Sequence, residues 1–460
     1  MRWLQPNVRW IVGLLAVGLA GGFAASTAHA QVVPAAAGVA VDANGVLSTK
    51  LFTDPTGQLG QERRQAAKAA LNPKVAAQSK LRKISLNRLE EAIRDRLAAG
   101  QKPTDEMLNL AGLTRVEYVF CMPDTRDIVV AGPAEGWAPD LSGRICGIHS
   151  GRPIVELQDL IVALRAFPPS GPATPLIGCS IDPTQEGLKR KVEYMRTNRP
   201  RSVADAEAFA TGLKAALGLQ NVTVNGVPGT THFAQVLVEA DYRMKLIGIG
   251  LEQPQVALKT YVQRANPNEV SKNAMCRWWF VPNYECVRVA DDELAMQLVG
   301  EGVKLVGADE VVMSNGQRQA AVRSNLASKA WCEQFTKSYA RIAEAKPIYA
   351  QLRNLVDLAV AAAFIQKEDY CAKTGWQMDL FRNEGQLPIQ TYSAPKQVET
   401  AINVIYKGNG FSTPIGGGVT IDPRQALNKS NLLKDKDGKV GNARKETDLK
   451  SLAKGQWWWD

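Results

Sequence analysis

Alternation of apolar and polar residues predicts short strands along much of the chain. Val39 and Val41 alternate with small residues and run into Asn44-Gly45. Asn-Gly between apolar residues is the strongest short signal of a hairpin turn, so a β-hairpin is predicted over residues 39–52. Similar patterns predict strands at 116–121, 128–131, 145–148, 176–181, 221–225, 233–240, 244–251, 277–281, 285–289, 294–299, 303–306, 309–313, 398–406 and 419–422.

Apolar residues at helical spacing predict separate helices between these strands. Leu86 and Ile93 lie on the apolar stripe of one such helix. Ser85 caps this helix and Gly100 ends it. Glu90 lies off the stripe and is predicted to face water. Further helices are predicted at 60–78, 104–110, 154–166, 201–217 and 255–264, and one begins at Asp182-Pro183.

Residues 331–359 predict a helical hairpin. Trp331, Phe335 and Tyr339 recur at helical spacing, and Pro347 begins a second apolar stripe. Short hairpins, mixed sheets and separate helices, without regular alternation of strand and helix, indicate an α+β protein with two to three subdomains.

Composition suggests where the chain divides. The clearest linker is the Pro-rich and Gly-rich segment 168–172. A second, weaker boundary precedes the helical hairpin. The predicted parts are a signal peptide at 1–30, an N-terminal α+β domain at 31–167, a central α+β domain at 173–320, the helical hairpin with C-terminal strands at 321–422, and a flexible basic tail at 423–460.

The first thirty residues predict export. Arg2 and Arg9 precede an uncharged stretch at 10–25, and Ala28-His29-Ala30 supplies small residues before a cleavage site. Cleavage after Ala30 places the mature chain in the periplasm, the cell envelope or the extracellular space. No Cys lies near this site, which argues against a lipid anchor, and no later apolar run reaches the ~20 residues of a spanning helix. The mature protein is therefore expected to be released.

Charge is concentrated towards the two ends of the mature chain. Residues 61–102 carry eleven basic and four acidic side chains, and residues 423–460 carry nine and five. The rest of the mature chain is slightly acidic. This pattern favours basic ends that contact an anionic envelope polymer, a lipid surface or a partner protein over a groove for specific nucleic acid. Solvated helix faces and a solvated tail would give the same composition.

The mature chain contains seven cysteines, so at least one thiol has no disulfide partner. Cys276 and Cys286 flank two predicted neighbouring strands, and opposed positions of a hairpin can meet disulfide geometry. Two separate buried thiols are the alternative. The other five are Cys121, Cys146, Cys179, Cys332 and Cys371.

No motif for a metal, a cofactor or a nucleophile is complete. Cys146 and His149 have a metal-like spacing, but His232 is the one other histidine of the mature chain. Gly248-Ile249-Gly250 lacks the third glycine of a dinucleotide loop, since Gln253 stands there. We therefore expect no metal and no cofactor.

Binding residues are sought first in the loop from Gly132 to Gly143. Its glycines and prolines are typical of a loop that presents side chains from a rigid scaffold. A plain surface turn is the alternative. The candidates on and beside this loop are Glu135, Trp137, Asp140 and Arg144.

Two further groups of residues are candidates. Asp241, Tyr242 and Arg243 form a polar interruption between apolar segments. Trp278 and Trp279 are neighbours in a predicted strand, where successive side chains point to opposite faces. One ring is therefore expected in the core, and the other must be covered by a second layer, a partner or a ligand.

Four segments carry a resemblance to a known family: Gly38–Leu47, Val129–Trp137, Glu239–Lys245 and Arg277–Pro282. They resemble exported planctomycete proteins that are catalogued as a domain of unknown function. The similarity runs over residues 35–425. It implies a secreted protein of a bacterium with an elaborate envelope, and it implies no activity, cofactor or catalytic residue.

These observations favour a secreted or envelope-associated binding or structural protein without catalytic activity, whose ligand is unknown. The alternative is a hydrolase that acts on cell-envelope polymer through a pair of carboxylates. Such a pair requires neither histidine nor metal and has no sequence signature. Two carboxylates that face each other across a cleft would favour the hydrolase.

Overall fold

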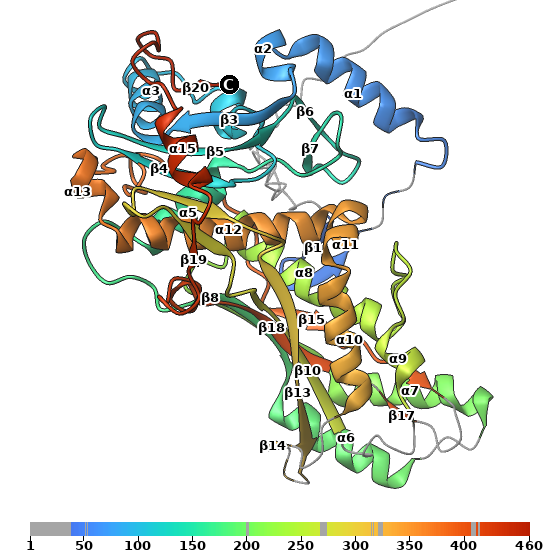
Figure 1. Cartoon of the computed structure of the whole chain (residues 1–460). Coiled ribbons are helices and arrows are strands. Elements are labelled where there is room, and N and C mark those ends of the chain that lie inside the picture. Colours follow the sequence, from blue (N-terminus) through green and yellow to red (C-terminus); the bar gives the residue numbers. More distant parts are fainter. Residues whose placement is uncertain are drawn as a thin grey trace, which may run out of the picture. The chain divides into compact units, whose positions relative to one another are not determined.

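The computed structural model describes residues 38–50, 52, 54–198, 202–266, 274–313, 315, 317–320, 325–405, 411–412 and 415–460. The predicted signal peptide lies outside these residues. Contacts join these described residues into one compact unit. Helices and mixed sheets alternate irregularly along it, so the predicted α+β class is confirmed (Figure 1).

The larger sheet has nine strands of mixed direction. The hairpin predicted at residues 39–52 is confirmed at one edge, where Val41 pairs with Leu47 across a turn that contains Gly45 at φ +83°. The sheet order is β1 (Val39–Val41), β2 (Val46–Thr49), β15 (Gln397–Glu399), β9 (Leu219–Asn225), β8 (Ile177–Pro183), β18 (Ile415–Ile421), β10 (Ala274–Pro282), β13 (Val303–Val312) and β14 (Arg318–Ala320).

The second sheet has seven strands, and they come from three of the predicted parts of the chain. The predicted boundaries at 167–173 and 422 therefore do not separate structural units. The order is β19 (Leu433–Lys434), β11 (Val287–Val289), β12 (Ala295–Leu298), β4 (Tyr118–Met122), β5 (Asp127–Ala134), β3 (Ser79–Ser85) and β20 (Trp458–Trp459). Two small pairs are β6 (Trp137–Pro139) with β7 (Ile145–Gly147) and β16 (Val404–Ile405) with β17 (Phe411–Ser412).

Fifteen α-helices lie in the described part of the chain. They are α1 (Gln58–Ala70), α2 (Pro73–Ala76), α3 (Leu86–Ala98), α4 (Asp105–Leu108), α5 (Leu157–Ala166), α6 (Gln185–Thr197), α7 (Val203–Leu217), α8 (His232–Gly248), α9 (Tyr261–Arg264), α10 (Leu326–Lys337), α11 (Tyr339–Ala345), α12 (Pro347–Lys367), α13 (Tyr370–Thr374), α14 (Pro423–Ala426) and α15 (Lys439–Lys445).

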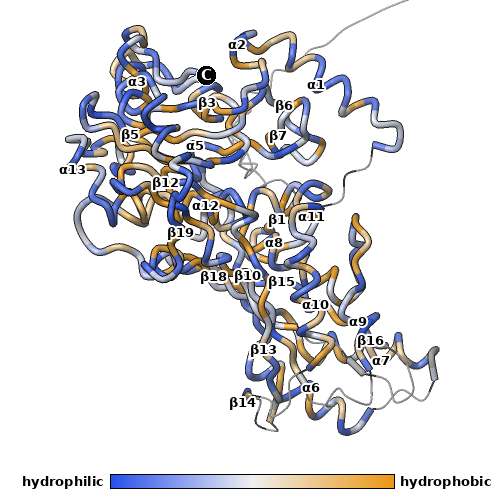
Figure 2. Tube along the Cα trace, viewed as in Figure 1, coloured by the Kyte–Doolittle hydropathy of each residue, from blue (hydrophilic) through white to orange (hydrophobic). Residues whose placement is uncertain are grey.

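The helical hairpin forms around α12, which Pro347 begins as predicted. Its first arm is divided at Ser338 into α10 and α11. By length and composition α12 is apolar enough to cross a membrane, but its most apolar window is completely buried in the protein. Figure 2 shows mainly apolar residues along this helix. It packs against α5 and α8, so it is a central element of the core.

Helix α8 replaces the strands predicted at 233–240 and 244–251. Thr231 caps this helix by accepting a hydrogen bond from the backbone N–H of Ala234. Most residues of α8 are buried, so its apolar residues surround the helix and leave no single stripe that marks a helical period. Gly248 ends α8 against the ring of Trp278, where a Cβ would lie 2.3 Å from a ring carbon.

The basic tail, predicted to be flexible, is folded. Residues 423–460 form α14, β19, α15 and β20. Trp457 is 6% exposed and belongs to the main core. Asp460 pairs with the buried guanidinium of Arg82 at 2.8 Å. Apolar burial and the ion pair between Arg82 and the partly exposed Asp460 therefore hold the tail in the seven-stranded sheet.

Candidate functional site

The two basic segments meet at one edge of the seven-stranded sheet. β20 pairs antiparallel with β3, so Trp458 lies opposite Ile84 and Trp459 opposite Lys83. An open pocket of about 560 Å³ lies here, lined by Lys74, Ala77 and residues 455–460. We call the group formed by Lys74, Lys80, Lys83, Trp458 and Trp459 the terminal surface. Lys74 and the two rings line the pocket, whereas Lys80 and Lys83 lie on β3. Trp458 and Trp459 are neighbours in a strand, so their rings point to opposite faces of this sheet edge, and Trp459 lies opposite Lys83.

Arg82 packs against the terminal surface from the protein interior. Its side chain is fully buried and donates hydrogen bonds to the carbonyl oxygens of Val75 and Ala111. Its guanidinium lies 4.7 Å from the centre of the Trp458 ring. The half-buried ring of Trp458 is therefore held in a fixed place, in the pocket that Lys74 also lines.

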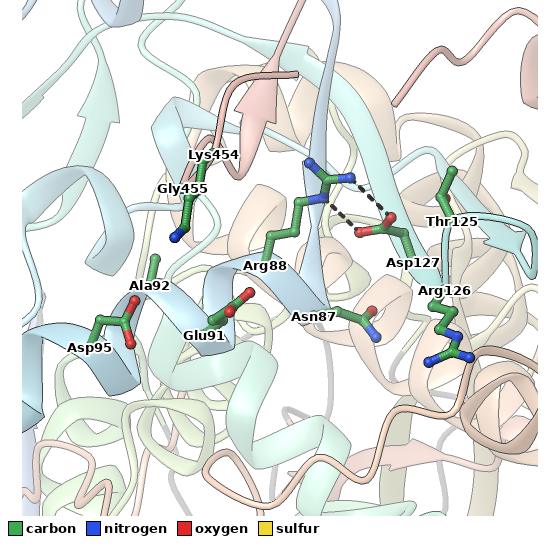
Figure 3. A pocket seen from close by; sticks show the side chains of 10 residues that line it. All are labelled: Asn87, Arg88, Glu91, Ala92, Asp95, Thr125, Arg126, Asp127, Lys454 and Gly455. Carbon is green, nitrogen blue, oxygen red and sulfur yellow. Dashed lines mark hydrogen bonds and ion pairs between the residues drawn. The ribbon is translucent and has the colours of Figure 1, made fainter. Parts of the chain in front are cut away.

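A second open pocket, of about 380 Å³, borders the same C-terminal segment. Figure 3 shows it between α3, the turn before β5, and residues 454–455. We call it the α3 pocket. Its charged lining residues are Arg88, Glu91, Asp95, Arg126, Asp127 and Lys454. Gly455 lines both this pocket and the pocket of the terminal surface.

Asp127 anchors the walls of the α3 pocket. Its carboxylate accepts hydrogen bonds from the hydroxyl of Ser85, which caps α3, and from Nε of Arg88 at 3.0 Å. Asn87 Oδ1 accepts a hydrogen bond from the backbone N–H of Ile128. The start of α3 is thereby tied to the start of β5. Sequence reasoning placed the charged face of this helix in water but did not identify the pocket.

Two of the loop candidates are buried behind the surface. Glu135 is 3% exposed, and its carboxylate accepts hydrogen bonds from the backbone N–H groups of His149 and Ser150. Trp137 packs with Val75 and Ile154 in a small apolar cluster. Both residues hold the loop together, so neither presents a side chain to a ligand.

Asp140 borders an open pocket of about 540 Å³ beside α1. Asp54, Arg64 and His149 line the same pocket. The Asp140 carboxylate accepts hydrogen bonds from the backbone N–H groups of Ser142 and Arg144 and so closes its own turn. Asp140 is therefore the loop candidate that the structure leaves at a pocket.

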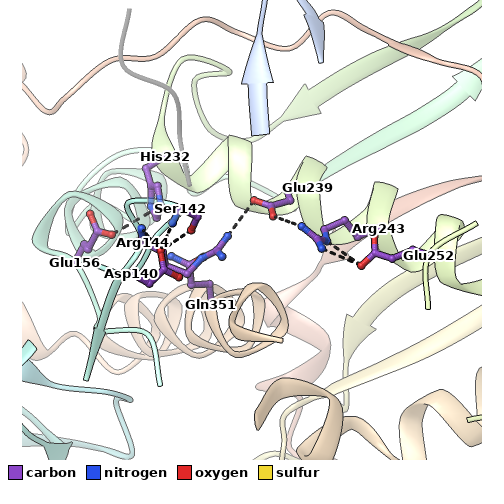
Figure 4. Close-up of polar contacts among 9 residues, drawn as sticks. All are labelled: Asp140, Ser142, Arg144, Glu156, His232, Glu239, Arg243, Glu252 and Gln351. Atoms are coloured by element: carbon purple, nitrogen blue, oxygen red, sulfur yellow. Dashed lines mark hydrogen bonds and ion pairs between the residues drawn. The ribbon is translucent and has the colours of Figure 1, made fainter. Parts of the chain in front are cut away.

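Arg144 and Arg243 meet at one buried carboxylate. Arg144 Nη2 lies 3.1 Å from Oε2 of Glu239, and Arg243 Nη1 lies 3.4 Å from Oε1 (Figure 4). Arg243 also pairs with Glu252, which Lys346 contacts in turn. We call these five residues the Glu239 network. Burial raises the pKa of Glu239, and the two guanidiniums oppose that shift.

The Glu239 network is structural. Glu239 is 1% exposed, so a ligand from solvent does not reach its carboxylate. Gly38, at the start of β1, packs directly on it, since a Cβ there would lie 2.3 Å from Oε1. The network therefore joins the loop region to α8 and is covered by the N-terminal hairpin.

His232 begins α8 near the same network. Its Nδ1 lies 2.9 Å from Oδ2 of Asp159. Burial alone would lower the pKa of His232, but the carboxylates of Asp159 and Glu156 raise it to about 9. The two carboxylates therefore favour the charged form of the imidazole. Across the described residues, no group of three His, Cys, Asp or Glu side chains is placed to hold a metal ion.

The remaining α8 candidates do not join one site. Asp241 pairs with Lys245 at 2.6 Å, and burial raises the pKa of Asp241 to about 6. The hydroxyl of Tyr242 donates to the backbone carbonyl of Glu399. The polar interruption seen in the sequence is thus a set of helix side chains with partners inside the protein.

Trp278 and Trp279 point to opposite sides of β10, as the strand period requires. Trp278 is fully buried and donates its indole N–H to the hydroxyl of Ser328. Trp279 is half-buried, and the guanidinium of Arg277 lies 4.6 Å from its ring centre. The core ring is Trp278, while Trp279 is covered in part by a neighbour on its own strand.

Cys276 and Cys286 are both free thiols, so the disulfide considered for them is not formed. The reason is that β10 and β11 do not form a hairpin. β10 pairs with β13 and β18 in the larger sheet, whereas β11 pairs with β12 and β19 in the smaller one. Burial raises the pKa of each thiol to about 12.

Comparison with known proteins assigns one segment of this α+β chain. Residues 179–261 are covered by a domain described as Protein of unknown function (DUF1598). This segment supplies α6, α7, β9, α8 and most of β8, and it includes Glu239. No curated protein and no solved structure gave a significant match. The terminal surface and the α3 pocket lie outside the matched segment.

Proposed function

We propose that the chain is an exported binding protein of the cell envelope, without catalytic activity, whose terminal surface binds an anionic envelope polymer. The observation that carries this proposal is the pairing of β20 with β3, which brings the two basic segments to one edge of the seven-stranded sheet, beside an open pocket that Lys74 lines. The planctomycete source and the export follow from the resemblance and the signal sequence.

The chemistry of the terminal surface fits an anionic chain. Lys74 and Lys80 are exposed and Lys83 is half-buried. Burial lowers the pKa of Lys83, and the carboxylate of Asp460 opposes that shift. The half-buried indole rings of Trp458 and Trp459 add apolar area on the two faces of this edge. Lysines attract phosphate or carboxylate groups, while flat rings contact the apolar faces of sugar or peptide units.

The hydrolase remains the second candidate, because the α3 pocket contains the carboxylates of Glu91, Asp95 and Asp127. Asp127 is already engaged by Arg88 and Ser85. A glycosidase needs one carboxylate that donates a proton and one that acts as base or nucleophile. Release of soluble fragments from envelope material would favour this candidate over the binding protein.

The test is retention of the mature protein on isolated envelope. The triple variant Lys74→Gln, Lys80→Gln and Lys83→Gln should be retained much less than the native protein, and about 0.5 M NaCl should release the native protein because salt screens exposed charges. Retention that is equal in the triple variant and insensitive to salt would contradict the proposal.

A matched control removes three exposed lysines elsewhere: Lys189→Gln, Lys259→Gln and Lys429→Gln. This control has the same net charge as the triple variant and should be retained like the native protein. Cell fractionation checks export separately. Uncleaved protein in the cytosol would contradict that part of the proposal.

A further inference from the structure

Four charged side chains of the α3 pocket have no partner in the part of the chain that the structure describes. They are Glu91, Asp95, Arg126 and Lys454, and among the described residues no ion pair or side-chain hydrogen bond engages their charged groups. All four are exposed. Their neighbours Arg88 and Asp127 neutralise each other at 3.0 Å. The free charges are therefore available to a ligand.

The free acids lie together at one end of the pocket. Glu91 and Asp95 are four residues apart on α3, so they share one face of that helix. Like charges at this spacing destabilise a helix. Figure 3 shows both carboxylates at the same end, with Lys454 above Ala92 between them. Two acids and one lysine leave this end net negative, which suits an ammonium group.

Hydrogen-bond donors lie at the other end. Figure 3 shows Arg126 and Thr125 there, beyond Asn87. The Thr125 hydroxyl is buried and has no hydrogen-bond partner in the described part of the protein. Asn87 uses its oxygen to accept from Ile128, which leaves its amide N–H groups free to donate. A guanidinium, a hydroxyl and an amide are suited to a carboxylate.

We propose that the α3 pocket binds a zwitterionic peptide group of the envelope ligand, with its ammonium at Glu91 and Asp95 and its carboxylate at Arg126. The proposal rests on the proposed function, because the pocket adjoins the terminal surface at Gly455. A volume of about 380 Å³ is within the range of small-ligand sites.

Charge complementarity selects the zwitterion over simpler ions. A lone anion drawn to Arg126 gains nothing from the acidic end, and a lone cation at Glu91 leaves Arg126 and Thr125 without an acceptor. A ligand with both charges engages both ends at once. The two contacts strengthen each other, because once one charged group of the ligand is bound, the other is held close to its own end of the pocket.

The experiment is an NMR titration of the mature protein with the dipeptide Ala-Ala, which carries both charges. We expect a Kd on the order of 1 mM, a typical value for so small a ligand. Two blocked probes remove one charge each: N-acetyl-Ala-Ala and Ala-Ala amide. Each should bind about tenfold more weakly, because each loses a charged hydrogen-bonding group. Equal binding of the three probes would overturn the proposal.

Variants of the α3 pocket test which end binds the ammonium group of the ligand and which end binds its carboxylate. Glu91→Gln with Asp95→Asn should weaken Ala-Ala about tenfold but leave N-acetyl-Ala-Ala unchanged, since that probe has no ammonium. Arg126→Gln should weaken Ala-Ala and leave Ala-Ala amide unchanged. The controls Glu186→Gln and Lys429→Gln, at exposed positions elsewhere, should bind Ala-Ala like the native protein. Unchanged Ala-Ala binding by the pocket variants would overturn the proposal.

The outcomes separate this proposal from the proposed function. Absence of Ala-Ala binding with salt-sensitive retention on envelope intact would overturn the zwitterion site alone. Ala-Ala binding at the pocket, with retention that ignores the lysines of the terminal surface, would support the site and overturn the polymer-binding function.

Discussion

The Glu239 network and the α3 pocket contain similar charged side chains, but those of the network are mostly buried and paired, whereas several of those in the pocket are exposed and unpaired among the described residues. In the network, Glu239 is 1% exposed and contacts Arg144 and Arg243. In the pocket, Glu91 and Asp95 are exposed and have no partner in the described residues. Sequence patterns singled out two network residues: Arg243, in a polar interruption between apolar segments, and Arg144, beside a loop with glycines and prolines.

The difference shows which charges serve the fold and which are available to a ligand. A buried charge loses its hydration, so it must be paired within the protein, and removal of one partner leaves the others uncompensated. An exposed charge keeps its hydration and contributes little to stability. Mutations should therefore affect mainly stability in the network and mainly binding in the pocket.

The largest expected effect is at the centre of the network. Glu239→Gln leaves Arg144 and Arg243 buried without their shared carboxylate and should cost about 3–5 kcal/mol of unfolding free energy. Denaturant unfolding measures it. Asp95→Asn in the pocket is the matched control and should change stability by less than about 0.5 kcal/mol. Similar losses in the two variants would abolish the distinction between the regions.

The next effect tests whether the tail is part of the core. Trp457 is 6% exposed, so Trp457→Ala should cost about 3 kcal/mol through lost burial and the cavity left behind. Trp459 is half-buried, and Trp459→Ala should cost clearly less. Thermal unfolding compares the two variants. An unchanged melting temperature for Trp457→Ala would show that the tail is flexible after all.

Local signals made part of the fold predictable. The hairpin turn at Asn44-Gly45 and the helix start at Pro347 depend on residues a few positions away, and both predictions are confirmed. Helix α8 was missed because burial on most sides removes its apolar stripe. The predicted boundaries do not separate structural units, because β12 pairs with β4 and β20 pairs with β3, and these contacts join residues far apart in the chain.

The site was less predictable for the same reason. Glu90 was expected in water, but it is buried and accepts a hydrogen bond from the indole of Trp376, 286 residues later. Glu135 and Trp137 belong to a segment with the composition of a binding loop, yet Trp137 begins β6 and packs with Val75 and Ile154. The Glu135 carboxylate accepts hydrogen bonds from the backbone of 149–150. The equal charges of Glu91 and Asp95 were the one local sign of the α3 pocket.

Lys191 differs from the Glu239 network, because it is a buried charged residue without an ion-pair partner among the described residues. Lys191 on α6 is fully buried, and its Nζ has no hydrogen-bond partner in the described part of the chain. Burial lowers its pKa to about 8, which the nearby Cys276 thiol opposes. Lys191→Met should therefore stabilise the protein at pH 7 by on the order of 2–3 kcal/mol, because the charged form pays for desolvation in the folded state.

The contribution of Lys191 to the unfolding free energy should depend on pH. Its pKa is about 8 when folded and near 10.5 when unfolded, so the unfolded chain binds more protons between these values. The unfolding free energy therefore rises as the pH rises from about 8 to 10.5, because of this lysine. Lys191→Met should remove that rise. Lys189→Met, at an exposed position on the same helix, is the control. A destabilised Lys191→Met protein would show that Nζ has a partner in solution.

The smallest expected effect has the opposite sign from that at Glu239. Glu91→Gln removes a like-charge repulsion with Asp95, one turn away on α3, and should raise the unfolding free energy by about 0.2–0.5 kcal/mol. The same change should weaken Ala-Ala binding, so stability and binding would move in opposite directions at one residue. Urea unfolding at low salt measures the gain, which about 0.5 M NaCl should diminish by screening. A loss of stability in Glu91→Gln would place Glu91 with Glu239 among the charges that hold the fold.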